Sequence, residues 1–139
     1  MPNPILEKSY TLSVLVVKLC TGPQADKLDL LRNQLFRSGT GCGANVEESQ
    51  AAESPRDFVH KIGIATKEAH ETGYWLRLAK DSGLLPEDLV REPLGLSEEV
   101  LKLGHAIIGS TRLRQGLKII ASVLLLSTSA LIGYLIFDI

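Results

Sequence analysis

Apolar and polar residues follow one another along the first half of the chain with the spacing of a helix face, at steps of four and three residues. The first stripe comprises Ile5, Ser9, Leu12, Val16 and Leu19, and Gly22-Pro23 should end that helix. A second helix should open near Asp26, because the period continues through Leu28, Leu31, Leu35, Ser38 and Cys42 and then, after a slip of one residue, through Val46 and Ser49. The pattern therefore predicts two helices joined by a short turn.

The third predicted helix has the clearest start. Ser54 is a candidate N-cap, Pro55 suits the first helical position, and Asp57 can complete a capping box. The helix should end at Ser82-Gly83. Its inward stripe holds heptad spacing through Phe58, Ile62, Ala65, Ala69, Thr72, Leu76 and Ala79.

Pro86, Pro93 and Gly95 predict an irregular connection with room for one short helical turn. Ser97, followed by Glu98 and Glu99, predicts the start of a fourth helix, because negative charge is favourable at a helix N-terminus. Its inward face should comprise Leu101, Gly104, Ile108 and Thr111. No segment alternates with the period of a strand. The chain is therefore predicted to be all-α, an antiparallel up-down four-helix bundle with an extended apolar C-terminal helix.

Three glycines lie inside the second predicted helix, at Gly39, Gly41 and Gly43. Each costs about 1 kcal/mol relative to alanine in a helix interior. The stretch therefore predicts either a kink or the close approach of another helix backbone. It follows no strand and lacks the lysine of a P-loop, so it does not predict a phosphate cradle.

The apolar residues are unevenly distributed along the chain. Of the 139 residues, 45% are hydrophobic but only 5% are aromatic, which favours helices over a β-sandwich. Between residues 119 and 137, 14 of 19 residues are apolar and none is charged. The prediction is a bundle domain at residues 5–118 and an apolar C-terminal helix at residues 119–137.

Charge and cysteine usage narrow the class of protein. The net charge of −1 gives no bulk attraction to nucleic acid and no repulsion from it. Cys20 and Cys42 share no metal-type spacing, so we expect buried thiols in a reducing compartment. The first residues show no basic segment followed by an apolar run, so no cleaved signal peptide is expected and a cytoplasmic location is predicted.

Three motifs occur in the order expected of a bacterial family: residues 37–48 (RSGTGCGANVEE), 54–58 (SPRDF) and 67–76 (KEAHETGYWL). On these motifs the chain resembles the four helix bundle protein family, over about residues 5–117. That family includes proteins encoded by intervening sequences in 23S ribosomal RNA genes and the accessory variability proteins of diversity-generating retroelements. The resemblance implies a bundle that assembles as a homo-oligomeric ring, typically a pentamer. The retroelement members are strongly basic and look like nucleic-acid-binding partners of a reverse transcriptase. This chain differs from them, because its net charge is near zero and it carries an apolar extension.

An outer stripe of the third helix places two acids among apolar residues: Ile64, Glu68, Glu71, Trp75 and Leu78. Carboxylates in such surroundings need partners, and we expect Arg37 to supply one, with Asn45 as a second donor. The cluster of Arg37, Asn45, Glu68 and Glu71 is either a binding or catalytic site or a structural ion pair that sets helix register, and the second interpretation is favoured.

No cofactor, metal ligand or catalytic residue is predicted. Di-iron bundles use Glu-x-x-His on paired helices, but the residues three before His60, His70 and His105 are Asp57, Lys67 and Lys102. Neither cysteine has a histidine near it in the sequence, as a nucleophilic enzyme would favour.

Seven cations of the second and third helices are candidate nucleic-acid-binding residues: Arg32, Arg37, Arg56, Lys61, Lys67, Arg77 and Lys80. In a ring, a modest basic stripe is repeated around the axis. The competing interpretation is a mixed, solvated face, because six acids interleave with the cations: Asp26, Asp29, Glu47, Glu48, Glu53 and Asp57.

The uncharged segment has the length of a membrane span, since nineteen residues rise about 28 Å and a hydrocarbon core is about 30 Å thick. Arg112, Arg114 and Lys118 precede it and only Asp138 follows, which predicts an inner-membrane anchor at residues 119–137 with the bundle in the cytoplasm. Its four hydroxyl residues make the segment only moderately apolar. The alternative is burial against the same segment of other copies.

Taken together, the residues and the resemblance predict a non-enzymatic assembly or adaptor protein, with RNA or DNA as the ligand that the resemblance implies. The alternative is a membrane-anchored helical oligomer that recruits a protein partner and binds no nucleic acid.

Overall fold

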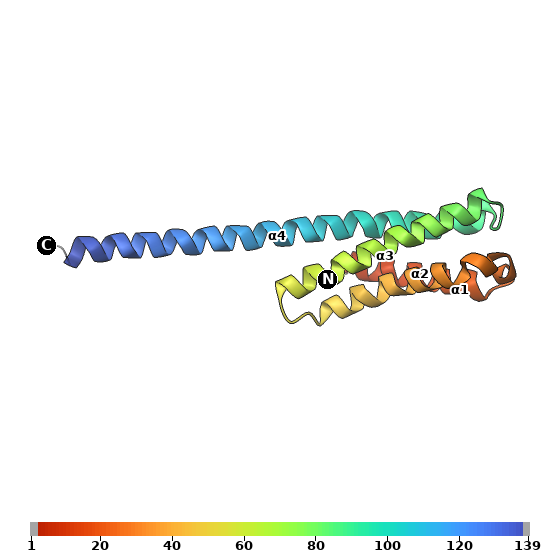
Figure 1. The fold of residues 1–139 in the computed structure, drawn as a ribbon, viewed down its shortest axis with the longest axis horizontal. Coiled ribbons are helices and arrows are strands. Elements are labelled where there is room, and N and C mark those ends of the chain that lie inside the picture. The colour runs from red at the N-terminus through yellow and green to blue at the C-terminus, as the bar shows by residue number, and fades with distance from the viewer. Residues whose placement is uncertain (1–2, 138–139) are drawn as a thin grey trace. The chain divides into compact units, whose positions relative to one another are not determined.

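The computed structural model describes residues 3–137, with side chains described through residue 128. Its elements are α1 (Pro4–Thr21), the 3₁₀ helix η1 (Ala25–Leu28), α2 (Asp29–Gln50), α3 (Pro55–Asp81) and α4 (Glu87–Phe137). In Figure 1 the chain reverses direction between successive helices, and no strand occurs among the described residues. The predicted all-α, up-down four-helix bundle is confirmed.

Local sequence determines where α1 and α3 begin. Pro4 occupies the first position of α1, where its missing N–H has no intrahelical partner to lose. Ser54 caps α3, because its Oγ accepts a hydrogen bond from the backbone N–H of Asp57 at 3.1 Å. The predicted capping box differs in one detail: the Asp57 carboxylate accepts from the N–H of Glu53 at 3.3 Å, one residue before the cap.

The stripes predicted for the first three helices form the core. All their members are buried except Leu31 and Phe58, which are partly buried and pack against the core. Leu12, Leu35, Ile62 and Leu76 are among the largest side chains that are fully buried. α2 begins at Asp29 rather than near Asp26, because the residues before it form the tighter turn of η1.

The glycine-rich stretch of α2 packs closely on α1. A Cβ built on Gly39 would lie 2.6 Å from Cγ1 of Val16, and one built on Gly43 would overlap Oγ of Ser13. The hydroxyl of Ser13 also donates to the Gly39 carbonyl at 2.8 Å. Of the two predicted explanations for the glycines, close helix approach is therefore the one found.

Small hydroxyl side chains join α2 to α3 inside the core. The hydroxyl groups of Thr72 and Ser38 lie 3.1 Å apart, and both side chains are fully buried. The Ser38 hydroxyl donates in turn to the Leu35 carbonyl at 3.3 Å. Buried polar atoms at this contact therefore have partners, which fixes the register of the two helices.

The prediction for the start of the fourth helix is wrong. α4 begins at Glu87 rather than Ser97, and Pro93 lies inside it. A proline there removes a backbone donor and crowds the carbonyl four residues back, at a cost of about 3 kcal/mol. Val90 and Pro93 are both buried, and burial of a side chain of this size contributes about 1.5–3 kcal/mol, which offsets the cost.

The inward face of α4 also differs from the prediction. Val100 and Gly104 are buried, whereas Leu101, Ile108 and Thr111 are only partly buried. The buried face of α4 begins at Val90, ten residues before Val100. Its helical period therefore reaches the core at Val100, one residue before the predicted Leu101, which explains the difference. Gly104 is needed at this face, because a Cβ there would overlap Oγ1 of Thr66 on α3.

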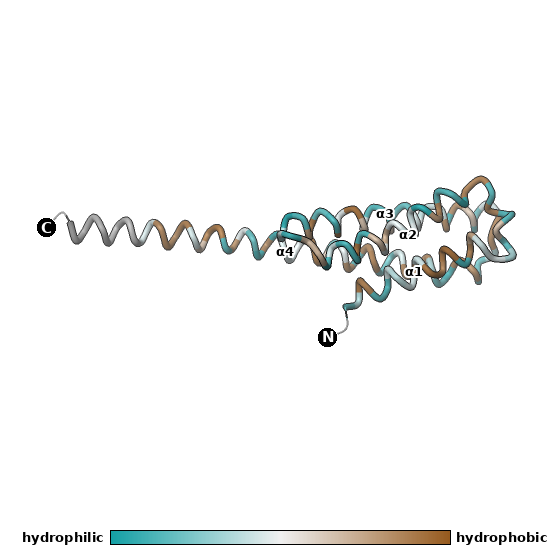
Figure 2. Tube along the Cα trace, turned by 90° about the horizontal axis from the view of Figure 1, so that it is seen from below, coloured by the Kyte–Doolittle hydropathy of each residue, from teal (hydrophilic) through white to brown (hydrophobic). Residues whose placement is uncertain are grey.

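The chain divides into two compact units, Met1–Ile108 and Gly109–Ile139. The first holds the bundle, in which Lys8 of α1 forms an ion pair with Glu99 of α4. The second holds the remainder of α4, whose large apolar side chains between Leu113 and Leu126 are all more than half exposed. Figure 2 shows brown, hydrophobic turns recurring in this segment.

Candidate functional site

The predicted polar cluster forms between α2 and α3. Nη2 of Arg37 lies 2.5 Å from Oε1 of Glu71, and Nη1 lies 3.4 Å from Oε1 of Glu68. The arginine side chain is 56% exposed, whereas those of Glu68 and Glu71 are 19% and 32% exposed. A single exposed guanidinium thus faces two carboxylates at the edge of the core.

An aromatic pair completes the cluster. The indole Nε1–H of Trp75 donates to Oε1 of Glu71 at 3.1 Å, and the Tyr74 ring meets the Trp75 ring edge-on with centroids 4.9 Å apart. The hydrogen bond from Trp75, together with Arg37, holds the pKa of the Glu71 carboxyl below its ordinary value. The hydrogen bond to Glu71 and the charges of Glu71 and Glu68 raise the pKa of Arg37.

Asn45 does not supply the second donor that was predicted. Its amide donates to the carbonyl of Gly41 at 2.8 Å, one turn earlier on its own helix. Oε2 of Glu68 is buried and has no hydrogen-bond partner among the described residues. An asparagine in a helix can bond a backbone carbonyl one turn earlier, and Asn45 uses this acceptor in place of a carboxylate.

Both cysteines are buried free thiols, as predicted from the sequence. Burial, with a smaller contribution from the charge of Glu68, raises the pKa of Cys42 to about 12. Burial also raises the pKa of Cys20, although Arg32 acts in the opposite direction. A thiol held in its neutral form is a poor nucleophile, so these residues act as small core side chains.

Four of the seven predicted cations lie close to acidic side chains: Arg32, Arg37, Lys61 and Lys80. Arg37 faces Glu68 and Glu71, as described. Nζ of Lys61 lies 2.5 Å from Glu48, and Nη2 of Arg32 lies 3.4 Å from Asp29. The pairs of Arg37 and Lys61 join α2 to α3, and that of Arg32 lies within α2; all three leave their cations less available to an external anion.

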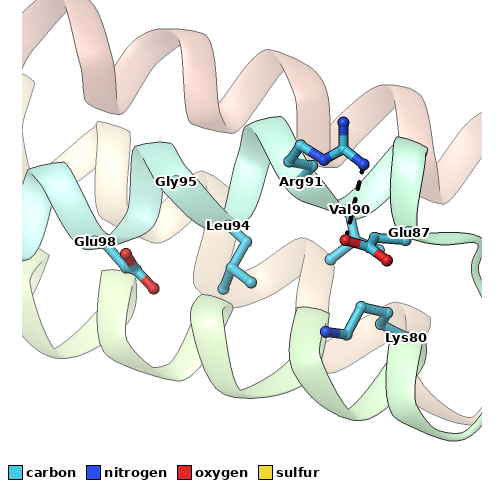
Figure 3. A pocket seen from close by; sticks show the side chains of 7 residues that line it. All are labelled: Lys80, Glu87, Val90, Arg91, Leu94, Gly95 and Glu98. Carbon is cyan, nitrogen blue, oxygen red and sulfur yellow. Dashed lines mark ion pairs between the residues drawn. The ribbon is translucent and has the colours of Figure 1, made fainter.

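Lys80, the fourth, lies in a groove between α3 and α4. Its Nζ is 3.5 Å from Asp81, and Arg91 pairs with Glu87, one turn earlier on α4, at 3.8 Å (Figure 3). The groove has a volume of about 210 Å³ and is lined by Lys80, Glu87, Val90, Arg91, Leu94, Gly95 and Glu98. With two cations and two acids around its rim, this groove favours no single sign of charge.

The other three cations share one exposed face of α3. Arg56, Lys67 and Arg77 are exposed and form no ion pair among the described residues. Steps of three, four and seven residues place three more exposed side chains on the same face: His60, His70 and Tyr74. We call these six residues the basic stripe. Three acids are next to its members in sequence: Asp57, whose carboxylate accepts from the N–H of Glu53, and Glu68 and Glu71, which belong to the polar cluster.

Gly63 lies in the seven-residue gap of the basic stripe. A Cβ built on it would meet no atom within 4 Å, so the surface there is open. Grouping the cations by helix does not identify His60, His70 and Tyr74 as their neighbours. The signal was present in their heptad spacing, which places them opposite the buried stripe of α3.

Comparison with known protein families identifies the family of this chain. The family model described as 23S rRNA-intervening sequence protein matches residues 2–106. The chain belongs to this family. The predicted resemblance is thereby confirmed, whereas the link to diversity-generating retroelements stays a prediction.

A solved structure of similar fold comes from Bacteroides thetaiotaomicron and is described as a protein with unknown function from the S23 ribosomal protein family. It is 34% identical, with a TM-score of 0.66, and the match covers 75% of this chain and 97% of that chain. No curated protein matches. The match therefore leaves about a quarter of this intervening-sequence family member without a counterpart in that structure.

The predicted membrane anchor, residues 119–137, lies beyond the residues that the family model matches. Within the residues whose structure is described, no helix combines the length and the apolar character needed to cross a bilayer. Side chains 129–137 of the predicted anchor lie outside the described residues.

Proposed function

We propose that this member of the 23S rRNA-intervening sequence protein family is a non-enzymatic, homo-oligomeric protein that binds nucleic acid through the basic stripe of α3. The observation that supports the proposal is the sorting of charge described above. Ion pairs occupy Arg32, Arg37 and Lys61, while Arg56, Lys67 and Arg77 face solvent on one side of one helix. A phosphate backbone binds such a line of cations with release of counterions.

Single strands suit this face better than a duplex. Tyr74 is half exposed within the stripe, and its ring stands nearly perpendicular to that of Trp75 in a T-shaped contact, so it is oriented before any ligand arrives. An oriented aromatic side chain offers a stacking surface to an unpaired base, worth about 1–3 kcal/mol. The bases of a duplex are already stacked and cannot use it.

Self-assembly is supported by exposed apolar residues on α2 and α3, two helical turns along from the polar cluster. Leu30 of α2 is 92% exposed and Leu78 of α3 is 36% exposed. The antiparallel pairing of Arg37 with Glu71 brings these two ends of the helices to the same height. A second copy that covers them would repeat the basic stripe around the assembly and raise its local field.

Fluorescence anisotropy with a labelled single-stranded RNA, over a series of salt concentrations, tests the proposal. The variant Arg56→Ser/Lys67→Ser/Arg77→Ser should bind more weakly and lower the dependence of log affinity on log salt by about 2 per subunit. The matched control Arg32→Ser/Lys61→Ser/Lys80→Ser removes the same charge from ion-paired positions and should keep most of the slope.

Two results would contradict the proposal. One is wild-type protein that shows no salt-dependent binding to RNA or DNA. The other is an equal loss in both triple variants, which would assign the effect to net charge rather than to the basic stripe. Sedimentation velocity on wild type and on Leu30→Ser/Leu78→Ser tests the assembly separately, with a shift to monomer expected for the variant.

A further inference from the structure

The segment of α4 from Arg112 to Leu125 carries cations and exposed apolar side chains in succession. Arg112, Arg114 and Lys118 come first, and the sequence holds no acid between Glu99 and Asp138. The apolar members are each more than half exposed: Leu113, Leu117, Ile119, Ile120, Val123, Leu124 and Leu125. Exposed apolar side chains on this scale mark an interaction surface.

The distribution of these side chains around the helix indicates the kind of partner. At about 100° per residue, the five large apolar residues between positions 119 and 125 cover about two thirds of the helix circumference. A partner helix covers a stripe of about 100°, so one second copy would leave most of this surface in water. A lipid phase surrounds a helix on every side.

The three cations of the segment also favour a lipid bilayer over a second copy of the chain. In a parallel assembly of copies, the three cations of each tail would lie at one height and repel one another. Anionic headgroups complement them instead. Residues 112–118 rise about 9 Å along the axis, comparable with the headgroup layer of a bilayer, and the apolar residues follow directly.

The hydroxyl residues in the segment and just after it do not oppose lipid contact. The side chain of Ser122 donates to the Lys118 carbonyl at 2.9 Å, that of Ser127 to the Leu124 carbonyl at 2.8 Å, and that of Thr128 to the Leu125 carbonyl at 2.9 Å. Each donor is thus satisfied within the helix, which removes most of the cost of leaving water.

We propose that residues 112–125 bind an anionic lipid bilayer, with Arg112, Arg114 and Lys118 at the headgroups and the apolar residues 119–125 among the acyl chains. This surface is separate from the basic stripe of α3. A family member with this segment would deliver its bundle to a membrane surface, which goes beyond nucleic-acid binding.

Flotation of the full chain with phosphatidylglycerol/phosphatidylcholine vesicles, against vesicles of phosphatidylcholine alone, tests the proposal. Wild type should float with the anionic vesicles. Each cation near an anionic surface contributes about a fivefold gain in binding, so Arg112→Ser/Arg114→Ser/Lys118→Ser should bind about a hundredfold more weakly. Leu124→Ser/Leu125→Ser should lose binding to both kinds of vesicle.

The triple variant of the basic stripe, Arg56→Ser/Lys67→Ser/Arg77→Ser, is the matched control: it should float like wild type while losing RNA binding. The tail triple variant should keep RNA binding by the bundle, so failure of either proposal can be told from failure of the other. Wild type that does not float overturns the lipid proposal. Equal flotation of the tail variants also overturns it, as does tail-dependent self-association in sedimentation without lipid binding.

Discussion

Gly39→Ala is expected to push α1 and α2 apart at a point where they pack closely. The added methyl carbon would lie 2.6–2.8 Å from Cγ1, Cγ2 and Cβ of Val16. Carbon atoms in contact normally stay about 3.5–4.0 Å apart, so α1 must move by about 1 Å. Val16 is β-branched and fully buried, so it cannot rotate out of the way.

The magnitude follows from three terms. Overpacking a core costs about 1–3 kcal/mol, and this contact lies at the upper end because the obstacle is near the backbone. A 1 Å displacement would stretch the Ser13–Gly39 hydrogen bond from 2.8 Å to beyond bonding distance, a loss of about 1 kcal/mol. Alanine returns about 1 kcal/mol of helix propensity. The net expectation is a loss of about 3 kcal/mol in the free energy of unfolding.

Urea unfolding followed by circular dichroism measures this loss. Gly63→Ala is the matched control, since it adds the same methyl group where no atom lies within 4 Å and should raise stability by about 1 kcal/mol. The double variant Gly39→Ala/Val16→Ala should be less destabilised than the sum of its two single variants. Equal shifts for Gly39→Ala and Gly63→Ala would refute the close packing of α1 on α2.

Three further predictions address the caps, the thiols and the polar cluster. Ser54→Ala should lower the unfolding free energy by about 1 kcal/mol and Ser54→Asp should not, because the cap accepts from Asp57; equal stabilities in urea would count against it. With both thiols buried and the pKa of Cys42 raised to about 12, a thiol reagent at about pH 8 should label native protein only as it unfolds; rapid native labelling would contradict the burial. Because the pKa of Glu71 is lowered in the fold, its contribution to stability is present above the ordinary carboxyl pKa and is lost as pH falls through the folded value. The variant Glu71→Gln should therefore lose less stability than wild type on acidification, as measured by urea unfolding. An unchanged pH dependence in the variant would rule the contribution out.

The sequence predicted the core faces of α1, α2 and α3 because each face repeats over several turns. At Val16, Cys42 and Ala69 the period alone identifies a buried residue. It failed at Pro93, where propensity favours a break and tertiary burial favours a helix. The balance there depends on α4 packing against the bundle, which no local pattern contains.

The polar cluster was only partly predictable for a similar reason. Arg37 and Glu71 are 34 residues apart, and their meeting depends on the register between α2 and α3. Asn45 was expected to join them and instead satisfies its own helix. Which cations are neutralised is therefore decided by packing, although which helix carries them is visible in the sequence.

The structural and functional interpretations of that cluster are complementary. Gly39 and Arg37 lie on different sides of α2, so the close packing on α1 also fixes where the guanidinium meets α3. There it offsets the charge of Glu71, which is partly exposed on α3 at an angle of about 40° around the helix from Lys67. Without that neighbour the two carboxylates would lower the potential of the basic stripe, which carries only cationic, histidine and tyrosine side chains. An ion pair that stabilises little by itself in water can thus govern the sign of the field on an adjoining face, which makes its position matter more than its strength.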